Sequence, residues 1–171
     1  PYSLIAHAQK RTPLLAKLLI SYRAAAGAKI ISTGAGAREI IRRLKANEII
    51  TQVVDQGGKD GRLVEFFGRQ AAMSTGAIRL ALKYGAGICL VDISRHKDGQ
   101  HRLVVDGPLE LVRTGNEDDD LNANLAIIIK RFEAKINEHP QEYLWFYKIW
   151  KYSNNINVLI LDDGRTGHLR Q

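Results

Sequence analysis

The chain has 171 residues, of which 45% are hydrophobic and 25% charged, and its formal net charge at pH 7 is +7. This composition is typical of a folded globular protein and excludes a disordered tail. No apolar run in the sequence approaches the roughly 20 residues that a membrane-spanning helix needs.

The positive charge favours a polyanionic partner, such as nucleic acid, acidic lipid headgroups or a phosphorylated carrier. The sequence has no zinc-ligand spacing and no glycine-flanked aromatic pattern of the RNA-recognition type, and acidic runs at 117–120 and 162–163 dilute any single-sign face. We therefore expect no nucleic acid and favour an anionic lipid surface. The single cysteine, Cys89, lies in an apolar stretch and is predicted to be a small buried residue.

The first part of the chain is predicted to alternate helices with strands. Apolar residues recur at helical spacing over residues 14–26, and this helix is expected to begin at Pro13 with Thr12 as its N-cap. A second helix is predicted over 34–46. Apolar stretches predict buried strands at 29–32 and 49–54.

The middle of the chain is predicted to hold shorter elements: a strand fragment at 64–67, a loop at 68–72, a helix at 74–84 and a buried strand at 87–93. The turn Lys97-Asp98-Gly99 precedes one more strand at 101–105. The last two strands are therefore predicted to pair as a hairpin.

The strongest helix pattern covers residues 121–138 and ends at His139-Pro140. Strands that alternate with helices predict an α/β fold with a mostly parallel central sheet flanked by helices. Asn154-Asn155 is the predicted linker, so residues 1–153 are expected to form one domain and residues 154–171 to open a second unit.

Two short segments are candidate binding sites. Asp55 and Gln56 follow a predicted buried strand, at the carboxyl end where open α/β sheets bind their ligands. Ser74 and Thr75 stand at the predicted N-terminus of a helix, where free N–H groups can hold a phosphate. Both segments also have a purely structural interpretation, because an Asp can simply begin a glycine turn and a Ser or Thr can cap its own helix.

The residues from His101 to Asp106 match the spacing His-x-x-x-x-Asp, in which a carboxylate orients an imidazole general base. We reject this pair as a catalytic dyad, because strand residues five apart point to opposite faces. No other histidine has an acidic residue five places further on. The chain is therefore predicted to contain no catalytic motif of this kind.

The segment from Pro140 to Lys151 packs aromatic and basic residues densely. Trp, Tyr and Lys suit the headgroup region of a bilayer, so the segment could form a membrane-interface patch. It could equally be an aromatic segment that closes the core.

Several of these elements, in order over about residues 4–152, resemble the bacterial lipid A late acyltransferases, the lauroyl and myristoyl transferase family within the lysophospholipid acyltransferase superfamily. The matching elements are Pro13-Leu-Leu leading to Arg23 and Gly27, Ile40 to Leu44 before Asn47-Glu48, the Asp55-Gln56 strand end, Phe66-Phe67-Gly68, Ala72 to Gly76, Arg95 before a Lys-Asp-Gly turn, Pro108-Leu109, and Pro140 to Trp145 with Lys148 and Lys151.

The resemblance implies transfer of a fatty acyl chain from acyl carrier protein or acyl-CoA to a hydroxyl of a lipid A-like or lysophospholipid acceptor, with no metal or redox cofactor. It implies a place at the cytoplasmic face of the bacterial inner membrane, with anionic lipid and the membrane surface as partners. It places the family's His-x-x-x-x-Asp/Glu motif upstream of Pro1. The substrate-binding residues that it implies are Arg23, Asp55, Gln56, Ser74, Thr75 and Arg95.

The sequence departs from the family pattern where Ala6-His-Ala-Gln9 replaces an expected Tyr-Arg-Pro, and where Pro140-Gln-Glu142 replaces Pro-Glu-Gln. The tail at 158–171 resembles the opening of mitochondrial-fission-like proteins, which are similar to nucleotide-sugar glycosyltransferases. Two alternatives stay open. One is a catalytically inactive acyltransferase-like module that binds lipid or acyl carrier, and the more distant one is a basic nucleotide-binding α/β protein.

Overall fold

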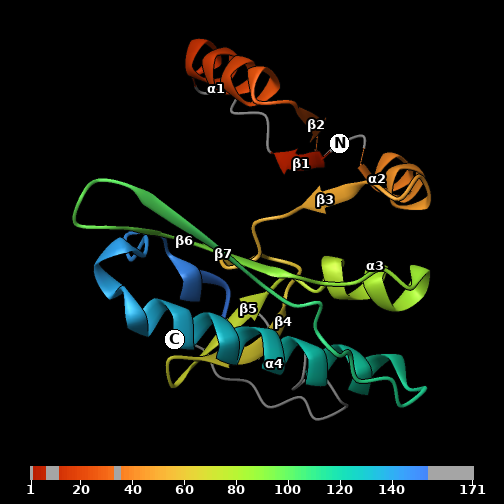
Figure 1. Ribbon diagram of the computed structural model, residues 1–171. Coiled ribbons are helices and arrows are strands. Elements are labelled where there is room, and N and C mark those ends of the chain that lie inside the picture. Colours follow the sequence, from red (N-terminus) through yellow and green to blue (C-terminus); the bar gives the residue numbers. More distant parts are fainter. Residues whose placement is uncertain (1, 7–11, 33–35, 154–171) are drawn as a thin grey trace, which may run out of the picture. The chain divides into compact units, whose positions relative to one another are not determined.

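The computed structural model describes residues 2–6, 12–32 and 36–153. These residues divide into two compact units, one within Pro1–Val53 together with Lys83–Ala86, the other within Val54–Leu82 together with Gly87–Gln171. Figure 1 labels the α-helices and β-strands of both units. The predicted linker and second unit at 154–171 lie outside the described residues.

The first unit is built on a three-stranded parallel sheet. Its middle strand is β1 (Tyr2–Ala6), and β2 (Ala28–Ser32) and β3 (Ile49–Thr51) pair with it on either side. Tyr2 is in register with Ala28 on one edge and with Ile49 on the other. Helices α1 (Pro13–Ala25) and α2 (Gly36–Lys45) connect these strands and contact the sheet. The α/β prediction and its parallel sheet are thus confirmed.

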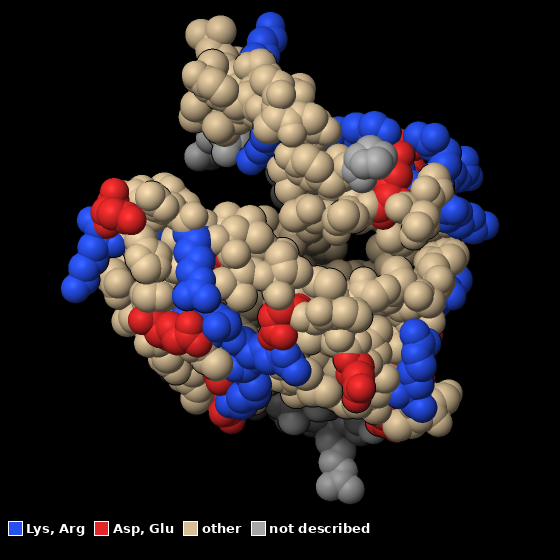
Figure 2. All heavy atoms as spheres, viewed as in Figure 1, with Lys and Arg blue, Asp and Glu red and all other residues tan. Residues whose placement is uncertain are grey.

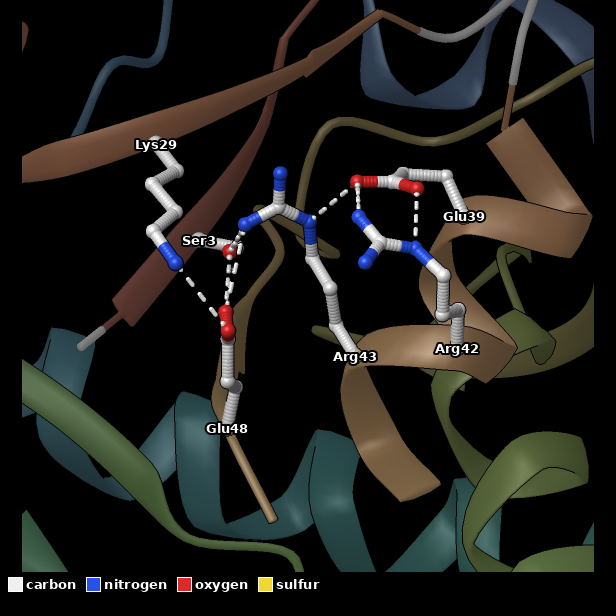
Figure 3. A network of polar contacts seen from close by, with 6 residues as sticks. All are labelled: Ser3, Lys29, Glu39, Arg42, Arg43 and Glu48. Atoms are coloured by element: carbon white, nitrogen blue, oxygen red, sulfur yellow. Dashed lines mark hydrogen bonds and ion pairs between the residues drawn. The ribbon is translucent and has the colours of Figure 1, made fainter. Parts of the chain in front are cut away.

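A network of charged side chains ties this sheet to α2 (Figure 3). The Glu48 carboxylate accepts hydrogen bonds from Lys29 on β2 and Arg43 on α2, each at 3.1 Å, and from the Ser3 hydroxyl of β1 at 3.3 Å. Arg43 also donates to the Ser3 hydroxyl, at 2.8 Å. The Lys29 and Arg43 partners lower the pKa of Glu48. Because these groups are hydrogen-bonded to one another, we assign the network a structural role, which is to hold the sheet against α2.

Helix α1 carries no buried residue, although most of its side chains are apolar. Leu14 is 82% exposed, and the same helix exposes further large apolar residues, which are Leu15, Leu18, Leu19, Ile20 and Tyr22. Its end is set by Gly27, whose φ of +81° lies in the left-handed region that favours glycine.

The second unit contains two antiparallel strand pairs. Strands β4 (Arg62–Phe66) and β5 (Arg69–Met73) form one, and β6 (Leu90–Arg95) and β7 (His101–Asp106) form the other. The remaining elements are α3 (Gly76–Tyr84), whose last two residues belong to the first unit, α4 (Glu117–Glu138) and the short 3-10 turns η1 (Pro140–Glu142) and η2 (Ile149–Tyr152).

The core of this unit lies where α4 crosses the β4–β5 pair. The helix begins at Glu117, and the side chain of its N-cap, Asn116, accepts hydrogen bonds from the backbone N–H groups of Asp118 and Asp119. The buried apolar residues that form the core are Phe66, Ala71, Met73, Ile78, Leu109, Leu121, Leu125, Ile128, Ile129 and Ile149.

Several sequence-based expectations differ from the structure. The strand expected at 49–54 is shorter, because β3 covers Ile49–Thr51, and it is not buried, since Ile49 is 68% exposed. Strand β1 was not foreseen. The segment at 68–72, expected as a loop, belongs mostly to β5, because Ala71, Ala72 and Met73 are buried beside β4. Cys89, expected to be buried, is exposed, since it precedes β6 and is not part of it. Among the described residues, no helix is both long and apolar enough to cross a membrane.

Candidate functional site

One end of the β6–β7 hairpin carries an open depression. Gly99 allows the tight turn because its φ is +83°, and the His96 N–H donates to the Gln100 carbonyl at 2.7 Å. This turn aligns Arg95, the last residue of β6, with His101, the first of β7. The predicted hairpin is therefore confirmed, and it places a guanidinium next to an imidazole.

An open pocket of about 360 Å³ lies at this end of the hairpin, lined by Ile93, Arg95, His101 and Glu142. Ile93 and Arg95 are two residues apart on one strand, so their side chains point to the same face. Glu142 comes from η1 and accepts the Arg95 backbone N–H with both carboxylate oxygens, at 3.0 and 3.2 Å. The carboxylate thus fixes the strand end, whereas no ion pair of the Arg95 guanidinium is recorded among the described residues.

The same face of the hairpin is apolar beyond the pocket. Val91 lies opposite Val105, and Ile93 lies opposite Leu103, and all four side chains are more than half exposed. A guanidinium binds phosphate or carboxylate oxygens in a planar, two-point geometry. The arrangement therefore offers a cationic end next to an apolar strip, which suits an amphiphilic anion.

Asp106 and His101 lie on opposite faces of the hairpin. The Asp106 carboxylate forms an ion pair with Arg131 of α4, at 2.6 Å. His101 lines the pocket on the other face. The two residues therefore have different surroundings and do not form the dyad that their spacing mimics.

Asp55 lies at the start of a glycine turn that follows β3 in the sequence. Its carbonyl accepts a hydrogen bond from the Tyr143 hydroxyl at 3.1 Å, and burial raises the pKa of its carboxyl. Tyr143 directly follows Glu142, so two consecutive residues contact Asp55 and Arg95. Gln56 is exposed.

The turn that follows Asp55 depends on Gly57. Its φ is +68°, and a Cβ at this position would meet the Ile149 carbonyl oxygen at 2.8 Å. Only glycine therefore fits between this turn and η2 without a backbone shift.

Ser74 and Thr75 occupy the start of α3, as predicted. The Ser74 hydroxyl accepts the Gly76 N–H at 3.4 Å, and the Thr75 carbonyl accepts the Arg79 N–H at 2.9 Å. Thr75 is buried. These contacts favour the structural interpretation of the two residues as the helix start.

The sequence-predicted residues are thus only partly brought together. Arg95 lines the pocket, Asp55 is linked to it through the Glu142-Tyr143 pair, and Ser74 and Thr75 are not among the lining residues. Arg23 lies in the last turn of α1 in the first unit.

Sequence reasoning missed Glu142 and set His101 aside. The signal for His101 was its place immediately after the hairpin turn, which aligns it with Arg95. For Glu142 no local signal exists, because it reaches Arg95 from a segment that follows α4.

No group of three or more His, Cys, Asp or Glu side chains suited to a metal ion occurs in the described residues. Figure 2 shows basic and acidic side chains interspersed on the face in view.

Comparison with protein families gives one match that covers most of the chain. A model described as bacterial lipid A biosynthesis acyltransferase matches residues 2–152. A search of the curated proteins found no match.

Proposed function

The chain belongs to the bacterial lipid A biosynthesis acyltransferase family, and we propose that the gene product that contains it transfers a fatty acyl chain from acyl carrier protein or acyl-CoA to a hydroxyl of a lipid A-like or lysophospholipid acceptor. The observation that carries the proposal is the pocket at the β6–β7 hairpin, within the matched residues, which Arg95 and Ile93 line at the end of an exposed apolar strip.

Arg95 is proposed to bind an oxygen of the acceptor phosphate or of the thioester. A guanidinium near an oxygen that gains negative charge stabilises that charge as it develops, and it does so best where water is partly excluded. The apolar strip formed by Val91, Val105, Ile93 and Leu103 would then contact hydrocarbon of the bound substrate. Glu142 is proposed as a positioning residue, because it holds the Arg95 backbone and leaves the guanidinium to the ligand.

The partners and location follow from the same proposal. A chain with a net charge of +7 is attracted to anionic lipid, and the active enzyme is proposed to work at the cytoplasmic face of the bacterial inner membrane. The proposed transfer uses no metal or redox cofactor.

A second candidate function is a catalytically inactive acyltransferase-like module that binds lipid or acyl carrier. It is favoured by one observation: Asp106, the carboxylate spaced correctly from His101, is engaged by Arg131 on the other face of the hairpin.

The test is an acyl-transfer assay on the gene product that contains this chain. It uses labelled acyl carrier protein or acyl-CoA with a lipid A-precursor or lysophospholipid acceptor, and product lipids are identified by mass. The matched variants are Arg95→Met and Arg102→Met, which remove one exposed arginine each from the same hairpin.

Transfer that falls at least tenfold in Arg95→Met and stays near wild type in Arg102→Met supports the enzyme. Arg95-dependent binding of the lipid without any transfer supports the inactive module. Transfer that is equally fast in both variants contradicts the role of the pocket.

A further inference from the structure

The turn between η1 and η2 exposes four consecutive apolar side chains. They are Leu144 (59% exposed), Trp145 (42%), Phe146 (96%) and Tyr147 (43%). A run of four exposed apolar residues destabilises a protein in water and favours aggregation, so its presence points to a surface that is covered when the protein works.

Both ends of this turn are held firmly, so its side chains are displayed by a defined backbone. The Trp145 indole donates to the Pro140 carbonyl at 2.7 Å, and the Tyr147 N–H donates to the Leu144 carbonyl at 3.1 Å. The Trp145 ring contacts the rings of Tyr143 and Phe67, with centroids 4.9 and 5.5 Å away. Beyond the turn, Ile149 is buried in the core.

The segment that contains the turn and the residues after it carries charged side chains of one sign. From Tyr143 to Ser153 the chain carries Lys148 and Lys151 and no acidic residue. Arg69 adds a third cation, since its guanidinium lies 4.8 Å from the centroid of the Trp150 ring. The nearest acidic residue before the turn, Glu142, is already bound to the Arg95 backbone.

We propose that the turn Leu144–Tyr147 docks the protein on an anionic bilayer, with Phe146 inserted among the acyl chains and Lys148 and Lys151 at the headgroups. The proposal rests on the proposed function for its class of partner, and it names the surface that makes the contact. Trp and Tyr on either side of Phe146 suit the headgroup boundary, where one edge of the ring is apolar and the other wet. An anionic bilayer matches both features, the exposed aromatic turn and the lysines that follow it.

The experiment measures binding of the full chain to vesicles of phosphatidylcholine alone and of phosphatidylcholine with phosphatidylglycerol. Phe146→Ser is compared with Leu14→Ser, which removes a similarly exposed apolar side chain from α1. We expect tight binding only to the anionic vesicles, a loss of roughly tenfold in Phe146→Ser because one large apolar side chain is withdrawn from hydrocarbon, and little change in Leu14→Ser. Lys148→Gln is expected to weaken binding by about fivefold, and added salt to weaken it further.

A second measurement follows the turn itself. In a Trp150→Phe background, Trp145 is the single tryptophan, and bromine-labelled lipids should quench its fluorescence in anionic vesicles. We expect Trp150→Phe to disturb the fold little, because the buried indole N–H of Trp150 has no hydrogen-bond partner among the described residues. Equal losses in Phe146→Ser and Leu14→Ser, binding independent of lipid charge, or no quenching of Trp145 each overturn the proposal.

The acyl-transfer assay separates this proposal from the proposed function. Phe146→Ser should retain transfer to an acceptor dispersed in detergent, since Phe146 does not line the pocket. Absence of transfer in all proteins, with Phe146-dependent vesicle binding intact, would contradict the enzyme and leave the docking surface supported.

Discussion

The side chain of Asn124 pairs with the backbone of Val112 as a neighbouring strand would. Its Oδ1 accepts the Val112 N–H and its Nδ2 donates to the Val112 carbonyl, both at 2.9 Å. Nδ2 also donates to the Asp120 carbonyl one turn back on α4, at 2.7 Å. Since Asn124 is 1% exposed, this side chain fastens α4 to the segment that leaves β7.

Replacement of Asn124 by Leu should therefore destabilise the second unit. The apolar side chain leaves the Val112 N–H and carbonyl without partners, which costs about 2–3 kcal/mol of the free energy of unfolding. Urea unfolding followed by circular dichroism measures the change. Asn122→Leu, on the exposed side of the same helix, should cost less than about 1 kcal/mol, and equal costs for the two variants would refute the account.

The carboxylate of Asp120 should make stability depend on acid pH. The Thr114 backbone N–H, at 2.6 Å, and the Thr114 hydroxyl, at 2.8 Å, donate to it and lower its pKa in the folded state. Its contribution is therefore present above the unfolded-state pKa of about 3.9 and is lost as the pH falls through the lower folded-state pKa.

Asp120→Asn should accordingly lose stability at neutral pH and show a shallower decline of the urea midpoint in acid. Part of the acid decline in stability should remain in this variant, because Arg42 and Arg43 lower the pKa of Glu39 in the first unit to about 2. The exposed Asp119→Asn is the control. A decline of unchanged steepness in Asp120→Asn would contradict the prediction.

Two adjacent glycines should respond oppositely to alanine. Gly57→Ala places a Cβ against the Ile149 carbonyl oxygen at a φ of +68°, and we expect a loss of about 1–3 kcal/mol. Gly58→Ala meets nothing within 4 Å and has no positive φ, so it should be neutral or stabilise by up to about 1 kcal/mol through the unfolded chain. Thermal unfolding of both variants measures the two effects. Equal changes in the free energy of unfolding would contradict the close contact between Gly57 and η2.

Residues 1–171 by themselves should not transfer acyl groups. His101 lines the pocket while Asp106 is bound to Arg131 on the opposite face, so the carboxylate five residues further on does not orient that imidazole. The measurement is thioester release from acyl carrier protein with a lipid acceptor present. Release well above an enzyme-free blank that disappears in His101→Ala would show that His101 acts as a base in some other way.

Patterns that repeat along one element could be predicted from the sequence, whereas contacts between distant segments could not. The helical stripe of α4 and the Lys-Asp-Gly turn of the β6–β7 hairpin depend on neighbouring residues, so both could be predicted. Strand β5 could not, because Arg69-Gln-Ala-Ala-Met73 has little strand propensity and is extended by its pairing with β4. For the site, Arg95 was found, while Glu142 became visible only when η1 was placed beside β6.

The central position of β1 has a consequence for how the protein is made. Both of its hydrogen-bonding edges are filled by strands that emerge later from the ribosome, the second ending at Thr51. Until then, at least one edge of β1 is unpaired, and two crossover connections must close before both edges are filled. The first unit should therefore fold late relative to the synthesis of its own first strand. A chaperone that shields nascent β1 would be expected to raise the yield of folded protein.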